Sequence, residues 1–137
     1  MFEAGLQDYA GFIGFAEAVE YLEKIGMEEI ERHEKRLNSF ISKHLINLGF
    51  NIIGPKDGER RGGITSFFLS RASPHEIAML FDEMANIMVR AGKHCVHSWF
   101  NAHGIEGSVR ASFYLYNTMT EAKIFVECAE KIIGIFS

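Results

Sequence analysis

The apolar residues in the first fifty positions recur at helical spacing. Residues 9–25 carry apolar side chains about one turn apart, and residues 27–48 repeat the pattern. Asp8 precedes the first segment as a helix cap, and Gly26 and Gly49 follow the two segments, where a glycine commonly ends a helix. The sequence therefore predicts two consecutive helices.

After residue 49 the pattern changes to short runs rich in β-branched and aromatic residues. Glycine, proline or polar residues bound these runs, as is typical of strands. They predict four strands, at residues 50–53, 64–69, 87–90 and 109–115. One or two helical turns are expected after the third strand, running through Trp99 and His103 and ending before Gly104.

Two capping boxes mark further helices. Ser73 is followed by Pro74 and Glu76, which is a strong helix start, and Thr118 with Glu121 opens a terminal helix to about residue 134. The residues expected on the apolar faces are Ile77, Leu80, Phe81 and Met84 in the first of these helices, and Ile124, Phe125, Cys128 and Ile132 in the second.

The resulting order, α-α-β-β-α-β-(α)-β-α, predicts an α+β fold. Short strands with tight connections indicate a small antiparallel or mixed sheet of about four strands covered by helices. A length of 137 residues suits one domain. We therefore expect residues 1–137 to form a single domain.

Composition narrows the classes of partner. The net charge is −4 and basic residues are scattered, which argues against nucleic acid. No apolar run approaches the ~20 residues that span a bilayer. The N-terminus lacks the features of a signal peptide, so the two cysteines are expected as free thiols in the cytoplasm. The 12 Phe indicate either a Phe-rich core or a face that packs on something outside this chain.

Cys95 is surrounded in sequence by basic side chains. The thiolate is the reactive form of a cysteine, and neighbouring positive charge favours it. Cys95 is therefore a candidate nucleophile, the alternative being an ordinary loop cysteine. Cys128 is instead spaced with the apolar residues of the last helix and is expected in the core. The neighbours of Cys95 are Arg90, Gly92, Lys93, His94 and His97.

Two other chemistries involve the same segment. His94, Cys95, His97 and His103 are zinc-binding residue types, but their spacing matches no structural zinc pattern and no second cysteine pair exists, so no metal is expected. A metal-binding regulator using His94, Cys95 and His97 stays open as a minor hypothesis. A Cys/His hydrolase needs a base oriented by a third group, which the sequence does not single out.

Arg110 lies within a predicted strand of mostly apolar or small residues. An arginine in such a place needs a partner, and its planar guanidinium matches a carboxylate. Arg110 is therefore a candidate carboxylate-binding residue, the alternative being a surface arginine on the solvent face of the sheet.

Cys95 and Arg110 lie in two motifs, R-A-G-K-H-C at residues 90–95 and V-R-A-S-F-Y-L-Y-N-T at residues 109–118. Together these motifs resemble the C-terminal part of group II, Suf-type cysteine desulfurases and the related selenocysteine lyases, which are pyridoxal-phosphate enzymes of the class V aminotransferase group. The resemblance extends over nearly the whole chain. It includes F-E-A-G at residues 2–5, G-F-I-G-F-A-E-A-V-E-Y-L at 11–22, R-G-G-I-T-S-F at 61–67 and P-H-E-I at 74–77.

The resemblance implies roles for the candidate residues. Cys95 would take sulfur from the cysteine–cofactor adduct and hold it as a persulfide, and Arg110 would bind the substrate α-carboxylate. Lys93 and His94 would help hold the thiolate. The implied fold is that of the C-terminal domain of fold-type I pyridoxal-phosphate enzymes, with residues 1–26 as a junction helix and residues 27–137 as the small domain.

The chain departs from the family in two ways. F-E-A-G is usually followed by T-P-N, whose threonine reaches the cofactor phosphate of the partner subunit, whereas Leu6 stands here and has no hydroxyl. The large domain that binds pyridoxal phosphate is absent, and no lysine of this chain matches the family's cofactor lysine motif. We therefore expect no cofactor on this chain alone.

Two functions follow from these observations. The first is the C-terminal domain of a cysteine desulfurase, which converts L-cysteine to L-alanine and is inactive without the large domain. The alternative is a stand-alone sulfur-carrier or protein-interaction module that kept Cys95. The expected partners are the pyridoxal-phosphate-binding large domain or a separate desulfurase, and a sulfur-acceptor protein.

Overall fold

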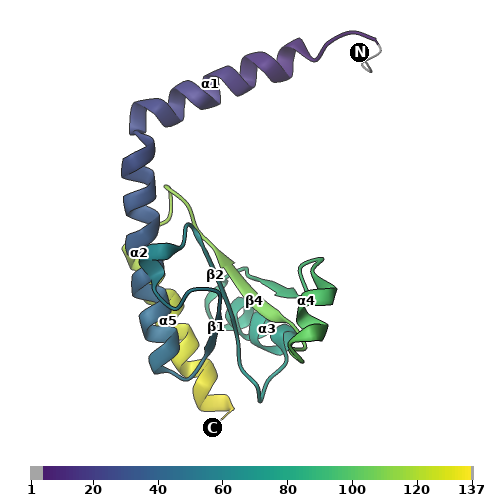
Figure 1. Ribbon diagram of the computed structural model, residues 1–137. Helices are drawn as coiled ribbons and strands as arrows, with labels where there is room; N and C mark the ends of the chain where they lie inside the picture. The colour runs from purple at the N-terminus through teal and green to yellow at the C-terminus, as the bar shows by residue number, and fades with distance from the viewer. Residues whose placement is uncertain (1–4, 137) are drawn as a thin grey trace.

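The computed structural model of the chain describes residues 5–136 (Figure 1). The order of its elements is the predicted one, with an added 3-10 turn, η1. Residues 2–4 of the F-E-A-G motif lie outside the described part. The elements are α1 (Tyr9–Ile25), α2 (Met27–Asn47), β1 (Asn51–Ile53), η1 (Gly58–Arg60), β2 (Ile64–Phe68), α3 (Pro74–Ala85), β3 (Arg90–Gly92), α4 (His97–Ala102), β4 (Ser108–Ser112) and α5 (Met119–Ile135).

The helix starts follow the predicted capping chemistry. The Asp8 side chain accepts a hydrogen bond from a main-chain N–H of the first turn of α1 at 2.9 Å. Ser73 and Glu76 form a reciprocal capping box at α3, and Thr118 and Glu121 form another at α5. These side chains pair N–H groups that a first helical turn leaves without partners.

The four strands form one antiparallel sheet in the order β1-β2-β4-β3. Thr65 of β2 lies opposite Ala111 of β4, and Arg90 of β3 lies opposite Arg110 of β4. The predicted α+β fold is confirmed, and of the two predicted sheet types the antiparallel one is found.

One face of the sheet packs against α2, α3 and α5. Alternation along the strands sends Phe67 and Val109 into this core, where both are fully buried. The Phe67 ring lies 6.2 Å from that of Phe81 on α3 and 6.0 Å from that of Phe125 on α5. Arg110 follows Val109 along β4, so its side chain emerges on the opposite face of the sheet.

Two strand predictions need correction. The prediction for residues 87–90 is wrong at its start, because pairing with β4 begins at Arg90 and continues to Gly92, while residues 87–89 stay outside the ladder. The prediction for residues 109–115 is too long at its end. β4 stops at Ser112, and the chain then turns, with Asn117 N–H donating to Tyr114 O at 3.0 Å.

Two residues predicted for apolar helix faces lie outside the core. Met84 is 42% exposed and Ile124 is 45% exposed. Met84 sits in the last turn of α3, where the chain leaves the helix, and Ile124 lines a groove under α5. Burial is confirmed for Ile77, Phe81, Phe125, Cys128 and Ile132.

Helix α1 projects away from the rest of the molecule (Figure 1). None of its residues is buried, and its predicted apolar stripe, which includes Tyr9, Phe12 and Ile13, is exposed to solvent. This exposure supports the interpretation that an aromatic-rich face packs on something outside the chain. No helix in residues 5–136 combines the length and apolarity needed to cross a membrane.

Candidate active site

Cys95 lies at the tip of a tight turn between β3 and α4. Val96 N–H donates to Lys93 O at 2.8 Å, and the two central residues of the turn, His94 and Cys95, have φ values of 48° and 64°. Positive φ at both central positions is typical of a type I′ turn, and side chains other than glycine rarely adopt it. Because Cys95 is exposed, this strained turn presents its thiol to solvent.

His94 connects this turn to β4. Its Nε2 lies 3.0 Å from Ser108 Oγ and 3.1 Å from Ser108 O. Donation to the carbonyl oxygen requires the proton on Nε2, which leaves Nδ1 as an acceptor. Nδ1 is buried and has no hydrogen-bond partner among the described residues. Burial lowers the pKa of His94 and the Arg110 and Arg90 cations add to this, against the raising effect of the Ser108 bond.

Lys93 and Gly107 hold the other side of the turn. Lys93 Nζ donates to Asn101 Oδ1 on α4 at 2.7 Å. Gly107 approaches β3 so closely that a Cβ at this position would lie 3.1 Å from the main chain of Gly92. The turn is therefore fixed against both α4 and the loop before β4.

Arg110 and Arg90 lie side by side on the sheet face opposite the core. They are directly paired across β4 and β3, so their side chains emerge next to each other. The ion pairs of residues 5–136 all lie on α1 and α2, and none includes either arginine. Arg110 Nε is also buried without a hydrogen-bond partner. Two adjacent guanidinium groups that lack an acid form a site suited to a carboxylate.

The pairing of β3 with β4 brings the two sequence candidates to one corner of the sheet. Gly92, which precedes the Cys95 turn, lies opposite Ser108, and Ser108 is separated from Arg110 by a single residue. The thiol of Cys95 and the guanidinium of Arg110 are thus carried by one strand pair.

Sequence reasoning missed Ser108, and it missed the pairing of Arg90 with Arg110. Alternation along β4 places Ser108, Arg110 and Ser112 on one face, so Ser108 could have been found once the strand was assigned. The pairing of Arg90 with Arg110 depends on strand register. No local pattern in the sequence fixes this register.

The remaining candidates have separate environments. Lys93 is bonded to Asn101, and His94 is bonded to Ser108. Neither of these bonds involves the Cys95 thiol, so the action of Lys93 and His94 on the thiol stays a prediction. No three His, Cys, Asp or Glu side chains within residues 5–136 are grouped to hold a metal ion, which leaves the metal-regulator hypothesis without support. Cys128 is buried as predicted, and burial raises the pKa of its thiol.

Comparison with known proteins gives consistent matches. The Aminotransferase class-V family matches residues 1–125. A probable cysteine desulfurase of Pyrococcus abyssi is 36% identical over 96% of this chain and 33% of its own length. A probable cysteine desulfurase of Streptomyces coelicolor is 38% identical over 98% of this chain and 32% of its own length.

A solved structure gives the same result. The apo cysteine desulfurase of Thermococcus onnurineus superposes with a TM-score of 0.90 at 36% identity, over 97% of this chain and 33% of that protein. The chain thus spans about a third of the length of the relatives that it matches. With its matching sequence and its matching α+β fold, the chain belongs to the class-V aminotransferase family and is similar to one third of a cysteine desulfurase.

Proposed function

We propose that this chain supplies the sulfur-accepting thiol and the carboxylate-binding arginine of a pyridoxal-phosphate-dependent cysteine desulfurase. The observation that carries the proposal is the β3–β4 pair, which holds Arg110 beside Arg90 and leads directly into the exposed Cys95 turn. The similarity to cysteine desulfurases supports the choice of substrate.

The proposed reaction transfers the sulfur of L-cysteine to Cys95. The substrate C–S bond breaks, an S–S bond forms to Cys95 Sγ, and the products are L-alanine and the Cys95 persulfide. The substrate carbon is reduced from a thiol-bearing CH2 to CH3 while the transferred sulfur is oxidised. No external oxidant or reductant is therefore needed.

Arg110 would bind the α-carboxylate of the substrate. A guanidinium presents two parallel N–H donors to a carboxylate, and this bond is strongest where the arginine is shielded from water. Arg110 is half-buried, its Nε lacks a partner among the described residues, and Arg90 adds a second positive charge. A bound carboxylate would give Arg110 Nε a hydrogen-bond partner and would neutralise part of the positive charge of the arginine pair.

His94 and Lys93 would support the thiol in different ways. Because the pKa of His94 is lowered, its imidazole is neutral and can accept a proton at Nδ1, but it supplies no positive charge. The ammonium group of Lys93 donates to Asn101 and is the local cation of the turn.

The residues of this surface do not fit the cofactor itself. Pyridoxal phosphate needs a lysine for its Schiff base and a charged partner for its pyridine nitrogen. The four strands contain neither a lysine nor an acidic residue, and Lys93 of the adjoining turn is bonded to Asn101. We therefore assign cofactor binding to the part of the polypeptide that the relatives carry outside the matched third.

A chimera tests the proposed role. This chain would replace the matching third of the Pyrococcus abyssi relative, and alanine formation from L-cysteine would be measured together with the mass of the Cys95 peptide. We expect turnover and a mass increase of about 32 Da on that peptide. Cys95→Ser should abolish turnover, whereas Cys128→Ala, the matched thiol control, should retain it. A chimera that turns over equally well with Cys95→Ser would contradict the proposal.

The exposure of Cys95 keeps a sulfur-carrier function as the second candidate. A carrier must offer its thiol to a separate protein, and the tip of the turn does so without the rest of a desulfurase. To distinguish the two, the isolated chain would be mixed with the intact Pyrococcus abyssi relative and L-cysteine. Persulfide on Cys95 under these conditions would favour the carrier, and its absence beside an active chimera would favour the desulfurase part.

A further inference from the structure

The two strands that carry the site separate just beyond it. The β3–β4 ladder ends at the Arg90 and Arg110 pair, and residues 87–89 continue without joining it. No backbone hydrogen bond connects residues 87–89 with residues 111–113 in the described chain. The sheet therefore opens at this point, although the apolar residues 87–89 have the composition of a strand.

The gap leaves main-chain groups of β4 without a partner. In an antiparallel ladder, successive residues direct their N–H and C=O groups alternately to the two neighbouring strands. Phe113 N–H donates to Gly63 O on the β2 side at 2.8 Å. The main chain of Ser112 therefore points to the other side, toward the segment that contains Met88. Unpaired strand edges of this kind readily accept another extended segment.

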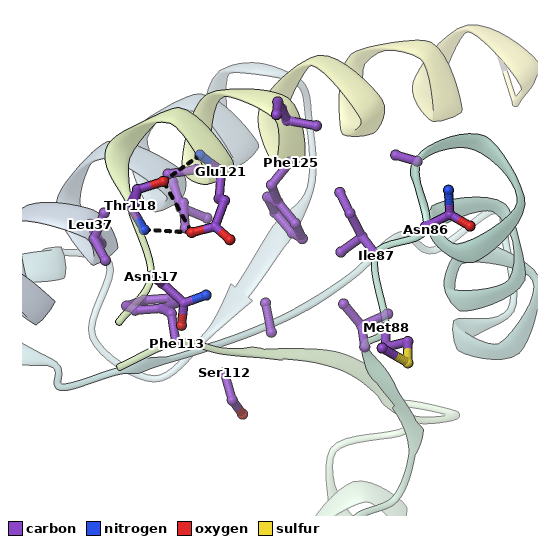
Figure 2. Close-up of a pocket in the computed structure, with 16 residues that line it drawn as sticks. Leu37, Asn86, Ile87, Met88, Ser112, Phe113, Asn117, Thr118, Glu121 and Phe125 are labelled. Atoms are coloured by element: carbon purple, nitrogen blue, oxygen red, sulfur yellow. Dashed lines mark hydrogen bonds between the residues drawn. The ribbon is translucent and has the colours of Figure 1, made fainter. Parts of the chain in front are cut away.

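A groove of about 420 Å³ lies beneath α5, between residues 87–89 and the end of β4 (Figure 2). Its walls are largely apolar. They come from α2, α5, the end of β4 and residues 85–89, and include Leu37, Ile87, Val89, Ala111 and Phe125. Figure 2 shows Ile87 and Met88 on one side, with Ser112 and Phe113 on the other.

Three of the polar side chains that line the groove, those of Asn117, Thr118 and Glu121, are already engaged. Glu121 accepts hydrogen bonds from Thr118 N–H at 2.6 Å and Thr118 Oγ1 at 3.0 Å, and Asn117 Oδ1 accepts from Tyr114 N–H at 2.9 Å. The hydrogen-bonding groups left for an occupant are the side chains of Asn86 and Ser112 at the rim and the free main-chain edge of β4. An apolar groove with a free strand edge suits an extended peptide better than a polar small molecule.

Two apolar side chains at the rim of the groove are exposed. Met88 is 89% exposed, and Ile124, which the sequence pattern places in the core, is 45% exposed. An occupant that covered both would bury apolar surface at this rim.

We propose that this groove binds an extended, apolar segment of the polypeptide that the relatives carry outside the matched third. The segment would pair its main chain with Ser112 and place alternate side chains under α5. The length of the relatives supports this occupant, since this chain covers 33% of the Pyrococcus abyssi protein and the remaining two thirds belong to the same polypeptide. Because β4 also carries Arg110, docking would hold the Arg90–Arg110 pair in register.

Overlapping peptides of about 12 residues, longer than a typical strand, would test the proposal. They would cover the part of the Pyrococcus abyssi relative outside the matched third, and binding to the full 137-residue chain would be measured by fluorescence anisotropy. We expect one contiguous segment to bind. It should shift the amide resonances of Met88, Ser112 and Ile124 and slow hydrogen exchange at Ser112.

Charged substitutions locate the binding site. Ile124→Lys should weaken binding by about tenfold or more, and Met88→Lys should act in the same direction. Met79→Lys is the matched control, because Met79 is an exposed apolar residue on α3 that does not line the groove. Circular dichroism would show that each variant keeps its fold.

Three outcomes would overturn the proposal: no peptide that binds below about 1 mM, equal effects of Ile124→Lys and Met79→Lys, or amide shifts confined to another face. Self-association of the chain through the groove would also contradict it, since a second copy would then be the occupant. The assay needs no desulfurase activity, so its failure and that of the proposed function are distinguishable.

Discussion

His94 and Cys95 both adopt positive φ, although neither is glycine or asparagine. A left-handed conformation costs an ordinary residue about 1–2 kcal/mol. Such strain persists where the side chain at that position is needed, because an unstrained sequence would otherwise be the more stable choice. The turn therefore costs stability while it places an exposed thiol next to a half-buried histidine.

Replacement of Cys95 by glycine should leave the isolated chain more stable than replacement by alanine. Glycine adopts positive φ without steric cost, although it also has the larger entropy in the unfolded state. We therefore expect the free energy of unfolding of Cys95→Gly to be about 0.5–1 kcal/mol higher than that of Cys95→Ala. Urea unfolding of the two variants measures the difference. Equal stability of both would show that the turn is not strained at this position.

His94 should make stability depend on pH. Its ordinary pKa is 6.5, and the folded value is lower, chiefly through burial. As pH falls below 6.5, the unfolded chain binds more protons than the folded one, so this contribution to stability is full above that pH and is lost as pH falls through the folded pKa.

Urea unfolding at several pH values, with and without His94→Asn, checks this dependence. Asparagine tolerates positive φ and keeps a polar side chain near Ser108. The variant should lose less stability between about pH 7.5 and pH 5 than the parent chain does. Parallel pH curves for the two proteins would assign the dependence to other histidines.

At the scale of elements, the β3–β4 pair combines two adjacent cations, neither of which forms an ion pair within residues 5–136. Arg90 and Arg110 are directly opposed, and like charges in this arrangement destabilise a sheet. The carboxylate of a bound molecule would offset the repulsion between the two guanidinium groups.

Removal of the Arg110 charge should therefore stabilise the isolated chain. We expect Arg110→Gln to gain about 0.5 kcal/mol at low ionic strength, with the gain shrinking as salt screens the repulsion. Arg71→Gln, at an exposed arginine outside the strands, is the matched control and should be neutral. A loss of stability that is independent of salt would mean that Arg110 serves the fold rather than a ligand.

The sequence predicts the helices well because their signals are local. Asp8, Ser73 and Thr118 act within one turn of the helices that they start, and the bounds of α1 match the prediction. The start of β3 is less predictable, because residues 87–89 have strand composition and only the path of β4 decides whether they pair. At the candidate site, local context singles out Cys95 and Arg110, and their roles stay predictions. The hydrogen bond between Ser108 and His94 could not be predicted, because it depends on how β3 and β4 pair in the sheet.

At the scale of the whole molecule, α1 shows that the described part of the chain leaves a large surface uncovered. Residues 9–16 of α1 contain no charged side chain, and a helix that is apolar on all sides is normally surrounded by protein. None of its residues is buried here, so packing within this chain contributes little to its stability. The apolar first half of α1 is therefore a surface that is open to contacts outside this chain.

This predicts that α1 can be made polar without unfolding the chain. The double substitution Phe12→Gln and Phe15→Glu should change the free energy of unfolding by less than about 0.5 kcal/mol, since neither ring is buried, whereas Phe67→Ala in the core should cost about 3–5 kcal/mol. The same double substitution should reduce concentration-dependent self-association, measured by sedimentation, because it removes exposed aromatic surface. A large loss of stability in the α1 variant would show instead that α1 folds back onto the sheet domain and is covered by it.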